Sequence, residues 1–212
     1  DDGTAELKVP SEPKIAAWDA EHPVLYRLAL TLRRGDAVLE TVEERVGFTD
    51  IQRIDPQILW NGKALKLRGV NYREPFPGEG RSLRGELQAL KDAHVNYLRS
   101  MYYPYSEACL ALCDELGFYV EQCAPFQEVG QGIASTQNAP DEAEGYGSQF
   151  FEMLRDGISH PCVAIWSLGG DSAWGSNFRH CYWLAKEMDP KRPVNFFYAM
   201  TVPEEEPELD IW

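Results

Sequence analysis

The sequence predicts an α/β chain in which consecutive strand–helix units follow a short all-β region. From Leu67 to Phe197, short apolar segments alternate with segments whose apolar residues recur at helical spacing. This alternation predicts a parallel sheet covered by helices. No G-x-G-x-x-G motif follows a predicted strand, so a dinucleotide-binding fold has no support. Consecutive strand–helix units of this length fit either a TIM barrel or a doubly wound sheet.

The first fifty residues are predicted to form strands. Residues 24–32 alternate apolar and other side chains, Gly35 lies in a turn, and residues 37–46 continue in extended form. This pattern predicts a β-hairpin with one face toward a core, and an earlier strand is expected at 6–9. Two or three strands do not make a stable sandwich. We therefore expect residues 1–50 to be the C-terminal part of a larger β-sandwich domain.

Residues 51–212 are expected to form the strand–helix domain. Its first element is a second hairpin over 58–67, since Asn61-Gly62 is the strongest two-residue hairpin turn signal. Ser106 is a helix N-cap and Gly117 a helix stop. A long loop is expected over 124–145. The strands are expected at 67–71, 96–99, 118–121, 162–168 and 194–197, with a sixth beginning at Leu209, and the helices at 83–93, 106–117, 148–159 and 177–188.

Composition excludes several classes of partner. The chain has 34 acidic and 20 basic residues and a net charge of −14, whereas nucleic acids and anionic membranes require a basic footprint. No run of about 18 apolar residues is present, so we expect no membrane span. The five cysteines are odd in number and show no C-x-x-C spacing, which favours neither a zinc site nor a disulfide framework. A neutral small molecule remains allowed as a partner.

Polar, aromatic and ionisable residues follow the apolar strands. Arg73 follows the first strand, Tyr102 and Tyr103 follow the second, and Asp171 follows the fourth. Barrel active sites form at these carboxyl ends. A lining of hydroxyls, carboxylates and rings suits a sugar, which offers many hydroxyls and one apolar face. The alternative is that these ends are polar only because they meet solvent.

Five ordered elements resemble glycoside hydrolase family 2, the β-galactosidase and β-glucuronidase family. They cover most of residues 45–195, and the ordered set is far more specific than any one element. The elements are V-G-F-T-D-I at 46–51 with the segment from Leu59 to Asn71, R-S-M-Y-Y-P at 99–104, C-D-E-L-G-F-Y-V at 113–120, H-P-C-V-A-I-W-S-L-G at 160–169, and D-P-K-R-P-V at 189–194.

The resemblance implies a partial (β/α)8 TIM barrel of about six strands, preceded by the last strands of an immunoglobulin-like sandwich. It also implies a retaining glycosidase with two carboxyl groups about 5–5.5 Å apart. The acid/base position is Asp171, and the nucleophile, near the end of strand seven, is expected beyond Trp212. This chain alone is therefore expected to be inactive. Its open parallel edges require the missing strands or a partner, such as a second copy in a homo-oligomer.

The resemblance also assigns substrate-binding positions. Gly170 replaces an Asn that commonly contacts the sugar 2-hydroxyl, and Asp171 is one methylene shorter than the family's Glu. The shorter side chain withdraws the carboxyl by more than about 1 Å, a displacement that can cost about 10²-fold in rate. Trp166 is expected at the floor of the site, with a core position as the alternative, and Trp174 is expected either as a sugar platform or in the core.

Other positions depart further from the family pattern. Arg73 and Tyr102 each replace a His, and Arg73 is expected to bind a substrate carboxylate or to pair with a local acid such as Glu74 or Asp171. An acidic pair after strand three is replaced by Gln122-Cys123. Where some members hold magnesium with a Glu and a His, this chain has Gln127 and Val129. We therefore expect no metal and no cofactor.

Two main hypotheses follow. In the first, the chain is part of a glycosidase acting on β-glycosides, because the carboxyl at Asp171 and the scaffold before it are retained. In the second, it is a pseudoenzyme, a carbohydrate-binding or structural relative, because the family's Asn-Glu is Gly170-Asp171. An unrelated α/β binding module is the third. Activity of the full-length protein, compared between wild type and variants at Asp171, separates the first two.

Overall fold

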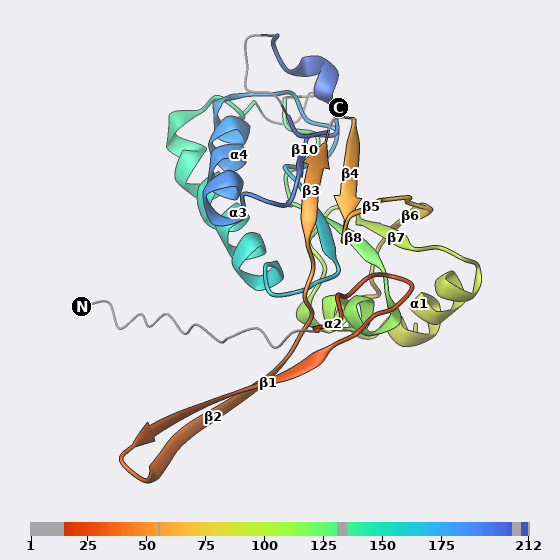
Figure 1. Ribbon diagram of the computed structural model, residues 1–212. Coiled ribbons are helices and arrows are strands. Elements are labelled where there is room, and N and C mark those ends of the chain that lie inside the picture. The colour runs from red at the N-terminus through yellow and green to blue at the C-terminus, as the bar shows by residue number, and fades with distance from the viewer. Residues whose placement is uncertain (1–14, 55, 131–134, 205–208, 212) are drawn as a thin grey trace.

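The computed structural model describes residues 15–54, 56–130, 135–204 and 209–211 (Figure 1). The strand predicted at 6–9 lies outside these residues. The strands are β1 Tyr26–Arg34, β2 Ala37–Val46, β3 Ile51–Ile54, β4 Gln57–Trp60, β5 Lys63–Ala64, β6 Gly69–Tyr72, β7 Tyr97–Ser100, β8 Tyr119–Cys123, β9 Val163–Ser167 and β10 Val194–Asn195. The helices are α1 Leu83–Asp92, α2 Glu107–Leu116, α3 Ala143–Gly157 and α4 Ser176–Met188, with 3-10 turns at Pro140–Glu142 and Ala199–Thr201.

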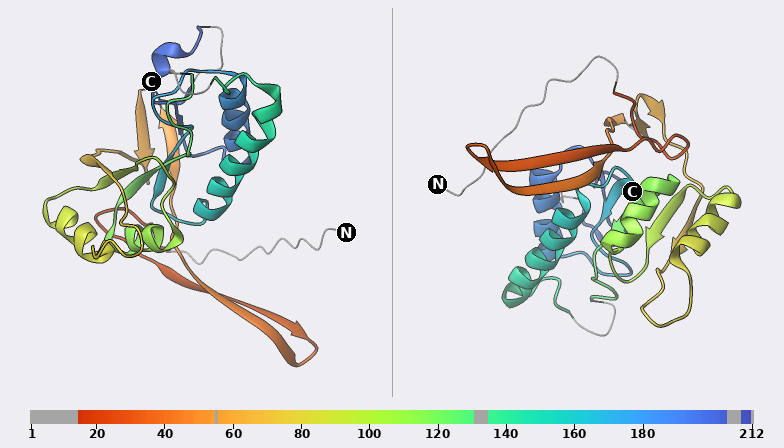
Figure 2. Two further views of the ribbon diagram at one scale, coloured as in Figure 1. Left: turned by 180° about the vertical axis from the view of Figure 1, so that it is seen from behind. Right: turned by 90° about the horizontal axis from the view of Figure 1, so that it is seen from below.

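Strands β6 to β10 form a five-stranded parallel sheet in which each strand pairs with the next one along the chain. A doubly wound sheet reverses this order at a switch point, whereas a barrel does not. Consecutive helices contact one another, α1 with α2, α2 with α3 and α3 with α4 (Figures 1 and 2). An isolated parallel bridge joins Asn195 to Ile211, close to the expected sixth strand. The order is therefore that of a partial (β/α) barrel.

Local signals explain the helix ends. The Ser106 hydroxyl accepts a hydrogen bond from the backbone N–H of Cys109, and α2 stops at Gly117, whose φ is 80°. Helix α3 begins earlier than expected, at Ala143, because Tyr146 is buried and its ring stacks on Phe126 at 4.4 Å. In the described part of the chain, no helix is both long and apolar enough to cross a membrane.

The second hairpin forms with the expected turn. Asn61 and Gly62 have φ values of 50° and 77°, as the Asn-Gly signal predicts. Its second strand, β5, is shorter than expected, and β3, which was not expected, pairs antiparallel with β4. The rings of Trp18, Trp60 and Tyr119 meet edge to face at centroid distances of 5.0–6.0 Å. This cluster joins the segment before β1 and the small sheet to the start of β8.

The first hairpin, β1 with β2, forms around Gly35 and projects from the rest of the molecule (Figure 1). The prediction that one of its faces meets a core is wrong for the described residues. Most side chains of both strands are exposed, because nothing described packs on this ribbon. The large exposed apolar residues are Leu30, Leu32, Val38, Leu39 and Val42.

Candidate functional site at the carboxyl ends of β8 and β9

The loop after β9 has a backbone that glycine makes possible. Gly169 has a φ of +147°, and a Cβ there would lie 2.5 Å from the carbonyl oxygen of Phe126. The N–H of Gly170 donates to that same oxygen at 3.0 Å, and the carbonyl of Gly170 accepts from the N–H of Glu128 at 3.2 Å. The loops after β8 and β9 therefore run side by side.

Asp171 follows at a left-handed φ of 48°, which costs a non-glycine residue conformational energy, although Asp tolerates it better than most. Ser172 holds the next position, since its hydroxyl donates to the carbonyl of Gly170 at 2.9 Å and accepts from the N–H of Val129 at 3.1 Å. The side chain of Asp171 is exposed, and its carboxylate has no hydrogen-bond or ion-pair partner among the described residues. It is left available to a ligand.

The side chain of Gln127 lies where a side chain at position 170 would begin. The two residues form a parallel bridge. A Cβ built on Gly170 would lie 2.5 Å from Oε1 of Gln127 and 3.2 Å from its Cδ and Nε2. The amide is half-buried, and among the described residues it donates to the Cys123 sulfur alone, at 3.8 Å. Sequence reasoning considered Gln127 only as a replaced metal ligand and missed this contact, which joins two loops far apart in the chain.

A buried ion pair lies between neighbouring strands below these loops. Glu121 of β8 is 3% exposed and accepts hydrogen bonds from Nε of Arg99 at 3.1 Å, from Nδ2 of Asn195 at 3.0 Å and from the hydroxyl of Tyr97. Burial, together with the charge of Glu121, raises the pKa of Tyr97. The Arg99 guanidinium also lies 4.3 Å from the ring centre of Phe197. Since Arg99 and Glu121 face each other across β7 and β8, this network fixes the strands that carry the loops.

Arg73 follows β6, as expected, but its partner differs from the expectation. Its guanidinium donates to both carboxylate oxygens of Glu79 at 3.1 Å and lies 4.9 Å from the ring centre of Phe76. The carboxylate of Glu74 is already used by the N-cap of α2, where it accepts from the N–H and hydroxyl of Ser106. Arg73 therefore pairs with a local acid, as expected, but that acid is Glu79 and not Glu74 or Asp171.

Tyr102 and Tyr103 follow β7 and are 50% and 59% exposed. Tyr102 has a left-handed φ of 68°. Tyr103 lines an open groove of about 380 Å³ together with Pro125 and Met153 of α3. Tyr103 therefore lies in a groove that reaches toward the helix layer.

Both candidate tryptophans lie in the core, which corrects the expectation that Trp166 forms the floor of the site. Trp166 is fully buried, and its indole N–H donates to Oδ2 of Asp189 at 3.0 Å. Trp174 is 8% exposed and packs on Phe178 and Phe196. The two ring systems pack in the core beneath the sheet and the loop, and neither exposes a ring face to a sugar.

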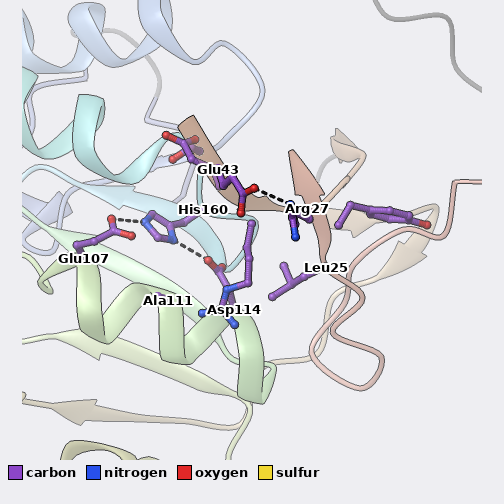
Figure 3. Close-up of a pocket in the computed structure, with 11 residues that line it drawn as sticks. Leu25, Arg27, Glu43, Glu107, Ala111, Asp114 and His160 are labelled. Atoms are coloured by element: carbon purple, nitrogen blue, oxygen red, sulfur yellow. Dashed lines mark hydrogen bonds and ion pairs between the residues drawn. The ribbon is translucent and has the colours of Figure 1, made fainter. Parts of the chain in front are cut away.

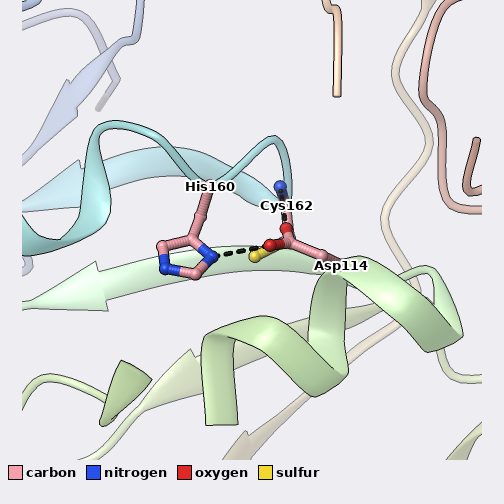
Figure 4. A group of neighbouring side chains, drawn as sticks. All are labelled: Asp114, His160 and Cys162. Atoms are coloured by element: carbon pink, nitrogen blue, oxygen red, sulfur yellow. Dashed lines mark hydrogen bonds and ion pairs between the residues drawn. The ribbon is translucent and has the colours of Figure 1, made fainter. Parts of the chain in front are cut away.

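A second polar cluster lies at the opposite end of β9. Asp114, His160 and Cys162 bring their donor atoms within 4.8 Å of one another, a spacing that could hold a metal ion (Figure 4). However, Oδ2 of Asp114 contacts Nδ1 of His160 at 2.6 Å, and Oδ1 accepts from the N–H of Cys162 at 2.9 Å. Burial raises the pKa of the Cys162 thiol well above its ordinary value, whereas metals bind thiolates. The side chains of this cluster are therefore engaged in hydrogen bonds with one another, which opposes metal binding.

A pocket of about 610 Å³ opens beside this cluster, between α2 and the base of the first hairpin (Figure 3). Leu25, Arg27 and Glu43 line it from the hairpin side, and Glu107, which contacts Nε2 of His160 at 2.8 Å, lines it from α2. None of these residues follows the carboxyl end of a barrel strand. The pocket is thus a junction between the hairpin and the barrel, far in the fold from the loops that carry Asp171.

The comparisons with known proteins decide the family. Residues 51–209 match the family described as glycosyl hydrolases family 2, TIM barrel domain. The chain belongs to glycosyl hydrolase family 2. Residues 2–48 match a second profile of the same family, described as glycosyl hydrolases family 2.

Curated relatives in this family include β-galactosidases. One from Vibrio cholerae serotype O1 is 34% identical over 186 residues, which is 84% of this chain and 18% of that protein. One from Pectobacterium atrosepticum is 33% identical over 186 residues, with the same two shares. The chain spans less than a fifth of the length of these relatives.

Solved structures of the family share the fold. The β-glucuronidase of Parabacteroides merdae gives a TM-score of 0.73 at 29% identity, covering 85% of this chain and 24% of that one. A β-galacturonidase of Eisenbergiella tayi, bound to galacturonate, gives 0.75 at 29% identity over 91% of this chain and 35% of that one. The five-stranded sheet is therefore part of a TIM barrel, preceded by strands of an immunoglobulin-like domain.

The magnesium ligands that occur in some family members do not fit this chain. Their positions are Gln127, whose neutral amide is a poor substitute for a carboxylate, and Val129, which has no donor atom.

Proposed function

We propose that this chain is part of a glycoside hydrolase of the β-galactosidase type, in which Asp171 is the general acid and base. The observation that carries the proposal is the state of that side chain. It follows the carboxyl end of β9, on a loop fixed by Gly169 and Ser172, and it is exposed without a partner in the part of the chain that the structure describes. A carboxyl held in place but left unpaired at the mouth of a barrel suits proton transfer to a ligand.

In the proposed mechanism, the carboxylic acid of Asp171 protonates the glycosidic oxygen while a second carboxylate attacks the anomeric carbon. The carbon–oxygen bond breaks, and a glycosyl ester forms. Asp171, now a carboxylate, takes a proton from water as that water attacks the ester, and the configuration is retained. The attacking carboxylate would come from outside these 212 residues, so the chain alone would be inactive.

A neutral β-glycoside is the substrate class that the described residues favour. The guanidinium of Arg73 is engaged by both oxygens of Glu79, so it is not free to take the carboxylate of a uronic acid. The curated relatives named above are β-galactosidases. The net charge of −14 opposes anionic partners such as nucleic acids and membranes.

Variants at Asp171 of the full-length protein test this proposal on a panel of aryl β-glycosides. Asp171→Ala and Asp171→Asn should lower kcat/KM by about 10²- to 10⁴-fold, and Asn tolerates the left-handed backbone as Asp does. The loss should be smaller for a dinitrophenyl leaving group, because it departs without protonation. Asp92→Ala, at the exposed end of α1, is the matched control and should keep wild-type rates.

The second candidate is a catalytically impaired, carbohydrate-binding relative, which Gly170 and the short side chain of Asp171 favour. Asp171→Glu decides between the two in the same assay. Near-zero rates in wild type, Asp171→Glu and Asp171→Ala alike would end the enzyme hypothesis. A wild-type rate that collapses in Asp171→Ala would end the pseudoenzyme hypothesis.

A further inference from the structure

We infer that Asn177 is a positioning residue for Asp171, because its side chain clamps the far end of the loop that carries Asp171 to the long loop after β8. The inference rests on the proposed function, in which Asp171 transfers the proton. Asn177 acts through the backbone of residues 169–176, which joins β9 to α4, and not through contact with the substrate.

The clamp consists of hydrogen bonds from Asn177 to the segment 136–139. Asn177 is the second residue of α4 and is 3% exposed. Its Nδ2 donates to the carbonyl oxygen of Thr136 at 2.8 Å and to that of Ala139 at 3.0 Å. Its backbone N–H donates to the carbonyl oxygen of Gln137 at 2.9 Å. Three carbonyls of one turn therefore converge on a single residue of the helix.

The same turn also caps α4, because the helix has no capping side chain of its own. Gly175 is the N-cap residue, and it is Oδ1 of Asn138 that accepts from the N–H of Ser176, at 2.9 Å. A Cβ on Gly175 would lie 2.5 Å from the carbonyl oxygen of Gln137, so the two backbones are in close contact. The first N–H groups of a helix need acceptors from outside it. The start of α4 therefore depends on the loop after β8.

The loop that carries Asp171 is thus held against the same neighbour along its length. The contacts of Gly170 fix it near β9, and the N–H of Ala173 donates to the carbonyl of Val129 at 2.7 Å. Asn177 fixes the end at α4. Without this clamp, the start of α4 can move away from the turn, and the loop loses its fixed end. A displacement of about 1 Å at the reacting group can cost about 10²-fold in rate.

The dependence of the rate on the leaving group separates the positioning of an acid from a loss of stability. Protonation of the leaving oxygen matters most for a poor leaving group such as phenol and least for dinitrophenol. A variant that misplaces Asp171 should therefore lose more activity on the phenyl glycoside than on the dinitrophenyl one. A variant that is merely less stable has fewer folded molecules and loses equally on both.

The experiment compares full-length wild type, Asn177→Ala and Asn96→Ala on phenyl and dinitrophenyl β-galactosides. Asn96 is the matched control: it is 5% exposed and its side chain also hydrogen-bonds two backbone groups, those of Lys66 and Arg68, but it lies at the amino end of β7. Asn177→Ala should lower kcat/KM roughly 10- to 100-fold on the phenyl substrate and less than about threefold on the dinitrophenyl one. Asn96→Ala should lower both by the same factor.

Asn138→Ala is the second variant, in case Asn177→Ala does not fold. Asn138 is exposed, so its replacement removes the cap on Ser176 without opening the core, and it should show a smaller version of the same leaving-group pattern. The Tm of each variant shows whether it is folded. If no folded variant of the clamp loses more on the phenyl substrate, or if Asn96→Ala shows the same pattern, the inference is overturned.

Hydrogen exchange keeps this test separate from the test of the proposed function. If wild type hydrolyses no substrate, the proposed catalysis fails, and the exchange of the backbone amides of residues 169–176, followed by mass spectrometry, then tests Asn177 alone. Faster exchange there in Asn177→Ala than in both wild type and Asn96→Ala supports the positioning of the loop. Equal exchange in Asn177→Ala and wild type overturns it.

Discussion

The two ends of strand β9 carry carboxylates in opposite states. At its amino end, Asp114 is buried, and both of its oxygens are taken, one by His160 and one by the N–H of Cys162. At its carboxyl end, Asp171 is exposed on a left-handed backbone, with no partner among the described residues. Asp114 therefore stabilises the fold through its hydrogen bonds, whereas Asp171 is positioned by the fold and makes no such contribution.

The amino end also shows how burial and charge compete. Burial lowers the pKa of His160, but the hydrogen bonds and charges of Asp114 and Glu107 outweigh this effect, and the net pKa is raised. Polar groups at that end therefore satisfy one another. At the carboxyl end, backbone hydrogen bonds hold the two loops together, and among the described residues Asp171 has no partner while Gln127 contacts only the Cys123 sulfur.

The largest expected loss of stability follows from a substitution at the amino end of β9. Asp114→Ala leaves His160 and the N–H of Cys162 buried without their partner, and it should lower the free energy of unfolding by about 3–5 kcal/mol. Asp171→Asn, the counterpart at the carboxyl end, should change it by less than about 0.5 kcal/mol. Calorimetric unfolding of both variants checks the pair. Equal destabilisation by the two would refute the contrast.

The next effect concerns the core beneath the carboxyl end. Trp166→Phe removes the N–H that donates to Asp189 and should cost about 1.5–3 kcal/mol of stability, as for hydrogen bonds to charged groups. Because Trp166 is fully buried, KM of the full-length protein should stay within about twofold of wild type. A large rise in KM with unchanged stability would place this ring in the site after all.

A third variant acts on the loop itself. Gly169→Ala forces a Cβ against the carbonyl of Phe126 at a φ that other residues rarely adopt, and it should cost about 1–3 kcal/mol. Because this loop positions Asp171, kcat should fall as well. Melting and steady-state kinetics measured together check it, with Gly35→Ala as the control: Gly35 also has positive φ but meets nothing within 4 Å. If Gly35→Ala lowered kcat as well, the loss in Gly169→Ala could not be attributed to the positioning of Asp171.

The smallest effect is a pH dependence at the amino end. Because the folded pKa of His160 is raised, its contribution to stability is present below the unfolded pKa of about 6.5 and is lost as pH rises through the folded value. The Tm should therefore decline over that interval in wild type and decline less in His160→Gln. A Tm difference between the two that stays constant with pH would show that the charge of His160 does not stabilise the fold.

Most of the fold could be predicted because its signals are local. Ser106 and Gly117 end α2 where expected, and the Asn61-Gly62 turn has the expected backbone. Strand β3 was missed because a strand of only four residues, Ile51–Ile54, shows little pattern in the sequence. The early start of α3 depends on the packing of Tyr146 on Phe126, a contact that no local pattern records.

The site was predicted less well, for a physical reason. Sequence order places Asp171 after β9, but it does not say which way a strand residue points. In β9, Trp166 points into the core, and in β8 Glu121 is paired with Arg99 of the neighbouring strand. The alternation of a strand could have indicated that Glu121 and Gln122 face opposite sides. The approach of Gln127 to Gly170 depends on two loops meeting, which no single segment encodes.

The two adjacent glycines of the loop after β9 differ in how much change they should tolerate. A Cβ at position 170 would meet only the far end of the Gln127 side chain, which can turn away. A Cβ at position 169 would meet a backbone carbonyl oxygen at a φ that other residues rarely adopt, and a backbone cannot turn away. Relatives should therefore replace the second glycine far more readily than the first.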